Sequence, residues 1–179
     1  MNKPCSIKDA IEILHQGGII GYPTESCYGL GCDPNHKRAV KSIYELKQRD
    51  MHKPMILIVS EWRHLEQLHV SLSTQQLEQL RETWPGPTTW LIKSRHPLAH
   101  NGKIAIRMVD HPIAKALCDQ WNGPLISTSA NLSDMPSATT IPMLIDYFDD
   151  QIDGIVAGDV GDRSQPSRII DLETLTQLR

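Results

Sequence analysis

Positive side chains are concentrated in one short segment of the sequence, KQRDMHKP at residues 47–54. Lys47, Arg49 and Lys53 lie within seven residues of one another, and Pro54 prevents a helix from continuing past them. Such a loop can hold a polyphosphate and stabilise charge at a reacting phosphorus, because arginine grips two oxygens at once and lysine acts as a mobile point charge. A solvated basic turn that complements the C-terminal dipole of a preceding helix is the structural alternative.

Two further segments carry hydroxyl groups. YPTESCYGLG at residues 22–31 contains Thr24 and two glycines, which permit tight turns and a close approach of the backbone to a ligand. It matches neither the G-x-x-x-x-G-K-[ST] phosphate loop nor the dinucleotide fingerprint, so a glycine-rich turn with a satisfied hydroxyl is an alternative. STSANLS at residues 127–133 places Ser129 and Asn131 after an apolar stretch, where they could contact a phosphate, a ribose or an amino acid, or form a polar turn.

Arg107 lies among apolar residues in the strand-like segment KIAIRMV. An unpaired guanidinium that faced the core would be costly, so we expect a carboxylate partner. That partner is either the carboxylate of a substrate or an Asp or Glu in a structural salt bridge. The order of residues indicates no Ser-His-Asp or Cys-His nucleophile. Cations, hydroxyl groups and backbone donors instead suit phosphoryl or nucleotidyl transfer, in which positioning and charge neutralisation do most of the catalysis.

Apolar periodicity predicts the elements that position these segments. Residues 6–16 are expected to form a helix with a capping box from Ser6 and Asp9, and further helices are expected at residues 36–47, 62–68, 73–83, 112–120 and 142–148. Strands are expected at residues 18–22, 55–59, 88–92, 103–108 and 124–128, and around Ile155 and Ile169. This order predicts one α/β domain over residues 1–179, with a mixed sheet and flanking helices. Because polar loops after the strands of such a sheet often line one crevice, we expect several loops to share a site.

The composition is that of a folded protein, since 40% of the 179 residues are hydrophobic and 22% are charged. A formal net charge of −3 gives no whole-molecule field that would attract nucleic acid. The N-terminus resembles neither a signal peptide nor a membrane span, so a cytoplasmic location is expected. The four cysteines are expected to be reduced, and neither Cys27 with Cys32 nor His96 with His100 is assigned a metal.

Taken in order, these segments resemble the YrdC/TsaC family of threonylcarbamoyladenylate synthases across nearly the whole chain. PTESCYGLG resembles the family's PT-E-x-x-YGLG signature, KQR followed by KP resembles its K-x-R element, STSANLS carries S-x-N, and QPSRIID resembles the closing P-S-x-I-x-D. WPGPTTWLI, IAIRMVDHP and PLISTSAN add support between them. The chain departs from common family patterns at Asp50, Ile58 and Val109. It resembles the short, single-domain type of the family.

The resemblance implies a twisted α/β fold with flanking helices and a large, positively charged cavity. It also implies that threonylcarbamoyl-AMP and pyrophosphate are formed from L-threonine, bicarbonate and ATP, with Mg²⁺ accompanying the ATP and no metal site built by the protein. The product would feed the t6A modification of adenosine 37 in tRNAs that read codons beginning with A. A separate threonylcarbamoyl transferase complex would complete that step.

Carried over motif by motif, the resemblance implies three groups of site residues. Lys47 and Arg49 would be catalytic and would hold phosphates. Nucleotide binding would involve Lys53, Asn131, Arg163 and Ser167. Threonine binding would involve Thr24, Thr89, Arg107 and Ser129.

Two other classes of function compete with the synthase. A double-stranded RNA-binding or ribosome-maturation factor would use the basic cavity without catalysis, but the acidic net charge and the lack of a recognised RNA-binding motif in the sequence argue against it. Carbamoyl transfer to another acceptor is the second, because related domains occur inside larger carbamoyltransferases. The chain is too short to contain the other modules of those enzymes.

Overall fold

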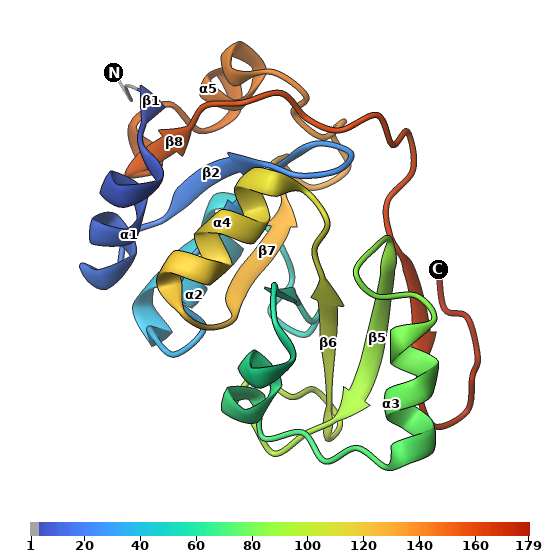
Figure 1. Ribbon diagram of the computed structural model, residues 1–179. Helices are drawn as coiled ribbons and strands as arrows, with labels where there is room; N and C mark the ends of the chain where they lie inside the picture. The colour runs from blue at the N-terminus through green and yellow to red at the C-terminus, as the bar shows by residue number, and fades with distance from the viewer. Residues whose placement is uncertain (1–3) are drawn as a thin grey trace.

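The computed structural model describes residues 4–179, and over this range the chain forms one nine-stranded sheet with helices packed around it (Figure 1). Neighbouring strands are parallel in four pairs (β1 with β8, β8 with β2, β4 with β6, β5 with β9) and antiparallel in the others. The predicted α/β class with a mixed sheet is therefore confirmed. In spatial order the strands are β1 (Pro4–Cys5), β8 (Gly154–Val156), β2 (Ile20–Pro23), β3 (Tyr28–Gly31), β7 (Leu125–Ser129), β4 (Ile56–Val59), β6 (Lys103–Met108), β5 (Thr88–Lys93) and β9 (Arg168–Asp171).

The helices lie close to their predicted positions. They are α1 (Ile7–His15), α2 (Lys37–Leu46), α3 (Thr74–Arg81), α4 (Pro112–Trp121) and α5 (Ile141–Phe148), with 3-10 helices η1 (Trp62–Leu68) and η2 (Asp149–Gln151). The predicted capping box begins α1, because Ser6 Oγ accepts from the Asp9 N–H at 3.2 Å and Asp9 Oδ2 accepts from the Ser6 N–H at 2.9 Å. The segment at residues 62–68 is helical as expected, but in the tighter 3-10 form.

No strand was predicted between residues 22 and 55, but the structure contains one there, β3. Only the middle of the segment at residues 22–31 turns, and YGLG forms β3, which pairs with β2 on one side and β7 on the other. A Cβ at Gly31 would lie 2.7 Å from Tyr22 Cε1 and 2.8 Å from the Ile126 carbonyl oxygen. Glycine is therefore needed in this strand so that the Tyr22 ring can pack against the backbone, and its low strand propensity is offset by pairing on both edges.

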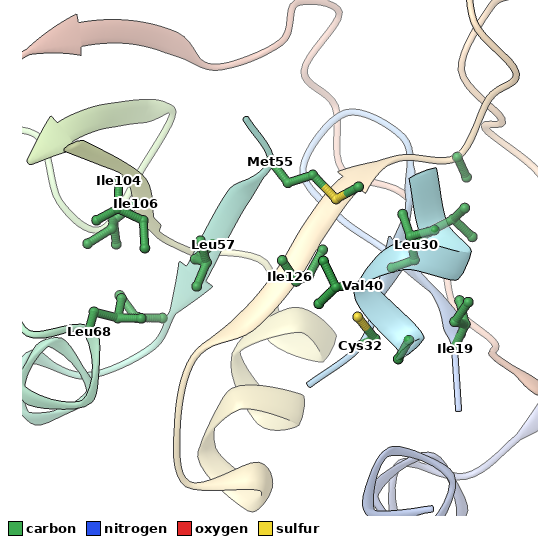
Figure 2. Close-up of a cluster of buried hydrophobic side chains, with 14 of the residues drawn as sticks. Ile19, Leu30, Cys32, Val40, Met55, Leu57, Leu68, Ile104, Ile106 and Ile126 are labelled. Atoms are coloured by element: carbon green, nitrogen blue, oxygen red, sulfur yellow. The ribbon is translucent and has the colours of Figure 1, made fainter. Parts of the chain in front are cut away.

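The two faces of the sheet are covered differently. On one face Leu57, Ile106 and Ile126 belong to the larger hydrophobic cluster, which α2 covers with Val40 and Ile43 (Figure 2). Because side chains alternate along a strand, the next residues point to the opposite face. There a second cluster is formed by residues of the sheet with α1 and α4, including Ile58, Leu125, Leu14 and Leu117.

Polar side chains replace this second cluster further along the same face. Arg107 pairs in register with Ile58, and Ser127 pairs in register with Ile56. Partners in register share a face, so Arg107 and Ser127 continue the surface on which α1 and α4 pack. The fold thus leaves a polar part of this face available for a cavity.

Within residues 4–179, no helix combines the length and the apolar character needed to cross a membrane.

Candidate functional site

A cavity of about 560 Å³ lies over the polar part of the sheet. Its walls come from the turn between β2 and β3, the loop after α2, strand β6, the end of β7, the segment before α5, the segment that enters β9, and the last residue. These include parts of the three polar segments at residues 22–31, 47–54 and 127–133, which were expected to line one crevice. That expectation is confirmed, and the cavity is large enough for a nucleotide-sized ligand.

The residues implied by the family resemblance divide into two groups. Those that line the cavity are Thr24, Arg49, Arg107, Ser129 and Ser167. Those that do not line it are Lys47, Lys53, Thr89, Asn131 and Arg163. Four members of the second group contact the first. Thr89 Oγ1 lies 2.8 Å from Ser167 Oγ, and Asn131 Oδ1 accepts a hydrogen bond from Ser129 Oγ at 2.7 Å. The Lys47 ammonium donates to the Ser129 carbonyl, and the Lys53 carbonyl accepts from Arg49 Nε at 3.5 Å.

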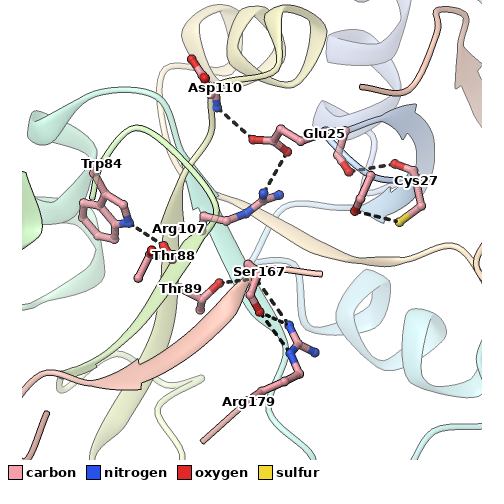
Figure 3. Close-up of polar contacts among 11 residues, drawn as sticks. Glu25, Cys27, Trp84, Thr88, Thr89, Arg107, Asp110, Ser167 and Arg179 are labelled. Atoms are coloured by element: carbon pink, nitrogen blue, oxygen red, sulfur yellow. Dashed lines mark hydrogen bonds and ion pairs between the residues drawn. The ribbon is translucent and has the colours of Figure 1, made fainter. Parts of the chain in front are cut away.

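Arg107 forms an ion pair inside the protein. Its Nη1 donates to Glu25 Oε2 at 2.8 Å, with the two side chains 11% and 9% exposed (Figure 3). The other carboxylate oxygen of Glu25 accepts from the Asp110 N–H at 3.0 Å. The structural salt bridge that the sequence left open is therefore present, while Arg107 still lines the cavity. Glu25 thus fixes one edge of the guanidinium and leaves its other nitrogens for a ligand.

The charge of Glu25 is maintained by these contacts. Burial alone would raise the pKa of Glu25, but the Arg107 charge and the Asp110 N–H outweigh it and hold the pKa below the ordinary 4.5. Sequence reasoning did not single out Glu25 as the partner of Arg107. Its place in the family signature was visible, yet 82 positions separate the two residues, so only the fold brings them together.

The segment between β8 and β9 is tied to the same corner of the site. The Gly161 N–H donates to the Thr24 carbonyl at 2.9 Å, and the Arg163 N–H donates to the Glu25 carbonyl at 3.0 Å. A Cβ at Gly161 would lie 2.8 Å from the Glu25 carbonyl oxygen and 3.0 Å from Glu25 Cα. The backbone of this segment, and with it Ser167, is held in place by that close approach.

Replacing Gly161 with alanine should displace the segment and destabilise the protein by about 1–3 kcal/mol, because the methyl group would overlap with backbone atoms that cannot move aside cheaply. Ligand binding should weaken with it, since Ser164, Pro166 and Ser167 line the cavity. Thermal unfolding and ligand titration measure the two effects. Gly102→Ala is the comparison: φ is +74° there and the added Cβ would touch nothing, so stability should fall without loss of binding. Unaltered binding in Gly161→Ala would contradict the prediction.

Lys47 is almost fully buried, with 3% of its surface exposed. Its ammonium donates to the Ser129 carbonyl, to the Asn131 carbonyl at 2.8 Å and to Asn131 Oδ1 at 2.9 Å. Burial, with a smaller contribution from Arg49, lowers the pKa of Lys47 to about 8. Its three N–H groups therefore all donate within the protein. Lys47 affects the cavity by holding the loop that carries Ser129 and Asn131 in place.

Arg179 is a cavity residue that the sequence analysis missed. Its Nε and Nη2 donate to the Ser167 carbonyl at 3.2 and 3.1 Å, and Nη2 lies 3.4 Å from Ser167 Oγ (Figure 3). The last residues fold back along β9, with the Leu178 N–H donating to the Ile169 carbonyl at 2.8 Å and the Ile169 N–H to the Arg179 carbonyl at 3.1 Å. No local signal marks Arg179, because only this fold-back brings it to the site.

The cavity is electropositive. Among the described residues, its charged lining consists of Arg49, Arg107 and Arg179. Burial, and then repulsion from Arg107 and Arg49, lowers the pKa of Arg179. Glu25 balances Arg107, whereas no carboxylate within residues 4–179 forms an ion pair with Arg49 or Arg179. Two uncompensated guanidinium groups beside several hydroxyls favour a polyanionic ligand.

Carboxylates and other metal ligands do not cluster in the described part of the chain: no group of three or more His, Cys, Asp or Glu side chains is arranged to hold a metal ion. Glu25, close to the cavity, is already occupied by Arg107 and the Asp110 N–H.

Known proteins with similar sequences belong to one family. Residues 12–179 match the family model of the Sua5/YciO/YrdC domain, described as "Telomere recombination". The chain is 41% identical to the threonylcarbamoyl-AMP synthase of Coxiella burnetii (strain RSA 493 / Nine Mile phase I), over 97% of this chain and 96% of that protein. It is 36% identical to the protein of the same name from Vibrio vulnificus (strain YJ016), over 97% of each chain.

Solved structures give the same result. The structure of P. abyssi Sua5 complexed with L-threonine superposes with a TM-score of 0.86 at 29% identity, covering 93% of this chain and 51% of that one. The present chain thus spans about half of that longer protein. E. coli YciO superposes with a TM-score of 0.86 at 28% identity, covering 97% and 87%. From residue 12 to its last residue, the chain belongs to the Sua5/YciO/YrdC family.

Proposed function

We propose that this protein is an L-threonylcarbamoyladenylate synthase, a nucleotidyltransferase that forms threonylcarbamoyl-AMP and pyrophosphate from L-threonine, bicarbonate and ATP. The observation that carries the proposal is the cavity itself, in which one oriented and two uncompensated guanidinium groups gather around hydroxyl groups. The relatives named threonylcarbamoyl-AMP synthase, which align with nearly the whole chain, support the same activity. So does the L-threonine complex of P. abyssi Sua5.

Arg107 is the proposed anchor for the threonine carboxylate. Glu25 already orients its guanidinium, so binding requires little reorganisation. The threonine amine captures bicarbonate with loss of water, and a carbamate oxygen then attacks the α-phosphorus of ATP. The new O–P bond forms as the bond to the β-phosphate oxygen breaks and pyrophosphate leaves.

Arg49 and Arg179 are proposed to bind the phosphates and neutralise the charge that moves onto the leaving pyrophosphate. Ser129, at the end of β7, and Ser167, just before β9, supply hydroxyl groups for the nucleotide or the amino acid. Mg²⁺ is proposed to enter with ATP, where it would lower the charge of the phosphates. The protein is therefore proposed to work chiefly by alignment and charge neutralisation.

The product is proposed to serve t6A modification of tRNA in the cytoplasm, through a separate threonylcarbamoyl transferase complex. An RNA-binding role without catalysis is less well supported, because the uncompensated cations lie in a cavity and the chain has a net charge of −3.

Incubation of the purified protein with ATP, Mg²⁺, bicarbonate and L-threonine tests the proposal, with mass spectrometry to detect threonylcarbamoyl-AMP and a separate assay for pyrophosphate. We expect product only when all components are present. Folded protein that binds ATP but forms no product would overturn the synthase assignment. A product that requires carbamoyl phosphate instead of ATP and bicarbonate would indicate carbamoyl transfer to another acceptor.

A further inference from the structure

Two loops that reach the cavity are joined by hydrogen bonds running in both directions. The first, the K-x-R loop, comprises residues 47–54, and the second, the S-x-N loop, comprises residues 129–135. In one direction the Lys47 ammonium donates to Ser129 and Asn131, as described above. In the other direction the Ser133 N–H donates to the Lys47 carbonyl at 3.1 Å. Ser133 Oγ lies 2.9 Å from the same carbonyl and 3.0 Å from the Gln48 carbonyl, so its hydroxyl hydrogen is shared between the two.

The hydrogen bonds from Ser133 lie at the C-terminus of helix α2, where backbone carbonyls lack partners within the helix. Helix α2 ends at Leu46, with Lys47 as its C-cap, and the carbonyls at a helix C-terminus have no partner within the helix. Gln48 follows with φ at +48°, a left-handed conformation that a residue with a side chain adopts only when its surroundings hold it there. Ser133 provides the missing donors at this point.

The hydrogen bonds from the Lys47 side chain stabilise the S-x-N loop in return. Asn131 Nδ2 donates to the Leu132 and Met135 carbonyls at 2.9 and 2.8 Å, so both hydrogens of its NH2 group are bonded within the S-x-N loop. Asn131 Oδ1 accepts from both Lys47 and Ser129 Oγ. The cavity residue Ser129 is therefore linked through Asn131 and Lys47 to the loop that carries Arg49.

We propose that Lys47, Asn131 and Ser133 form a clasp that fixes the distance between Arg49 and Ser129 in the cavity lining, with Ser133 acting as a positioning residue for nucleotide binding. The identity of the nucleotide rests on the proposed function, whereas the clasp rests on the contacts alone. Ser133 lies outside the cavity lining, so a change in ligand binding on its replacement must be transmitted through the loops.

Hydrogen–deuterium exchange of the ligand-free protein tests the clasp independently of any activity. In Ser133→Ala the amides of both loops should exchange faster, because the carbonyls of Lys47 and Gln48 lose a donor from the other loop. Ser133→Thr retains the hydroxyl and should behave as the natural protein does. Ser71→Ala makes the same chemical change at an exposed site and should alter neither loop. Faster exchange confined to residues 131–135, or no change, would overturn the proposal.

Steady-state kinetics test its consequence for binding. The KM for ATP should rise about tenfold in Ser133→Ala, the effect of one to two lost hydrogen bonds, while the KM for L-threonine changes less than about twofold. The slope of log KM for ATP against log salt should stay unchanged, because no phosphate contact has been removed. Equal increases in both KM values, or no rescue by Ser133→Thr, would reject Ser133 as a positioning residue. If the natural protein forms no product, the synthase assignment fails, and the exchange experiment still decides the clasp.

Discussion

Replacing Arg107 with alanine should raise the KM for L-threonine by about tenfold to a hundredfold, because a charge-assisted hydrogen bond contributes about 1.5–3 kcal/mol. The KM for ATP should change by less than about threefold, since Arg49 and Arg179 remain. Initial rates measured over a range of each substrate separate the two effects. An unchanged KM for threonine would remove Arg107 from the amino-acid site.

The same substitution should also destabilise the protein, and this effect needs its own control. Glu25, which is 7% exposed, would lose its cation, and an uncompensated buried charge typically costs about 3–5 kcal/mol. The double variant Arg107→Ala with Glu25→Gln removes that charge, so it should recover stability without recovering threonine binding. If the double variant regained a low KM, the loss in the single variant would have been caused by misfolding of the site.

Acid titration of stability gives a second check on the ion pair. The pKa of Glu25 is held below 4.5 in the folded protein, so its contribution to stability is fully present above that pH. This contribution is lost as the pH falls through the lowered value. In Arg107→Ala the burial of Glu25 is opposed only by its remaining N–H contacts, so the acid-induced loss should become smaller.

The elements that sequence reasoning predicted well are those with strong local signals. The capping box at Ser6 and Asp9, the proline that begins α4 and the apolar strands of the sheet depend on residues a few positions apart. Strand β3 was missed because glycine at positions 29 and 31 signals a turn, whereas the fold uses Gly31 to accommodate the Tyr22 ring. Local propensity cannot predict that contact between neighbouring strands.

Residue type predicted which polar segments meet at one cavity, whereas the role of each residue in binding or catalysis stays a prediction. Arg49 and hydroxyl groups of the polar segments do line one cavity, but the sequence could not show which acceptors each cation would meet. Lys47 lies against the S-x-N loop, Arg107 against Glu25, and Lys53 outside the cavity lining. The contacts of Lys47, Arg107 and Arg179 join residues distant in sequence, which local patterns do not reveal.

The other large effect concerns Arg49 and Arg179. Replacing either with alanine should raise the KM for ATP by about tenfold to a hundredfold, because each guanidinium lines the cavity and has no carboxylate partner within residues 4–179. Each donates to backbone carbonyls, Arg49 to Lys53 and Pro54 and Arg179 to Ser167, so its charge is left for a phosphate. Lysine at either position keeps the charge but loses the paired donors, so it should restore binding only in part. Arg38→Ala, which removes an exposed arginine of α2, is the matched control and should leave the KM for ATP unchanged.

The ionic-strength dependence of ATP binding distinguishes direct phosphate contact from an indirect effect. If Arg49 and Arg179 each contact a phosphate, salt should weaken ATP binding less steeply in either single variant than in the natural protein, and least steeply in the double variant. A positioning role would instead weaken binding by a similar factor at every salt concentration. Since Arg179 donates to the Ser167 carbonyl, this measurement decides whether its charge binds the nucleotide or only supports the segment that carries Ser167.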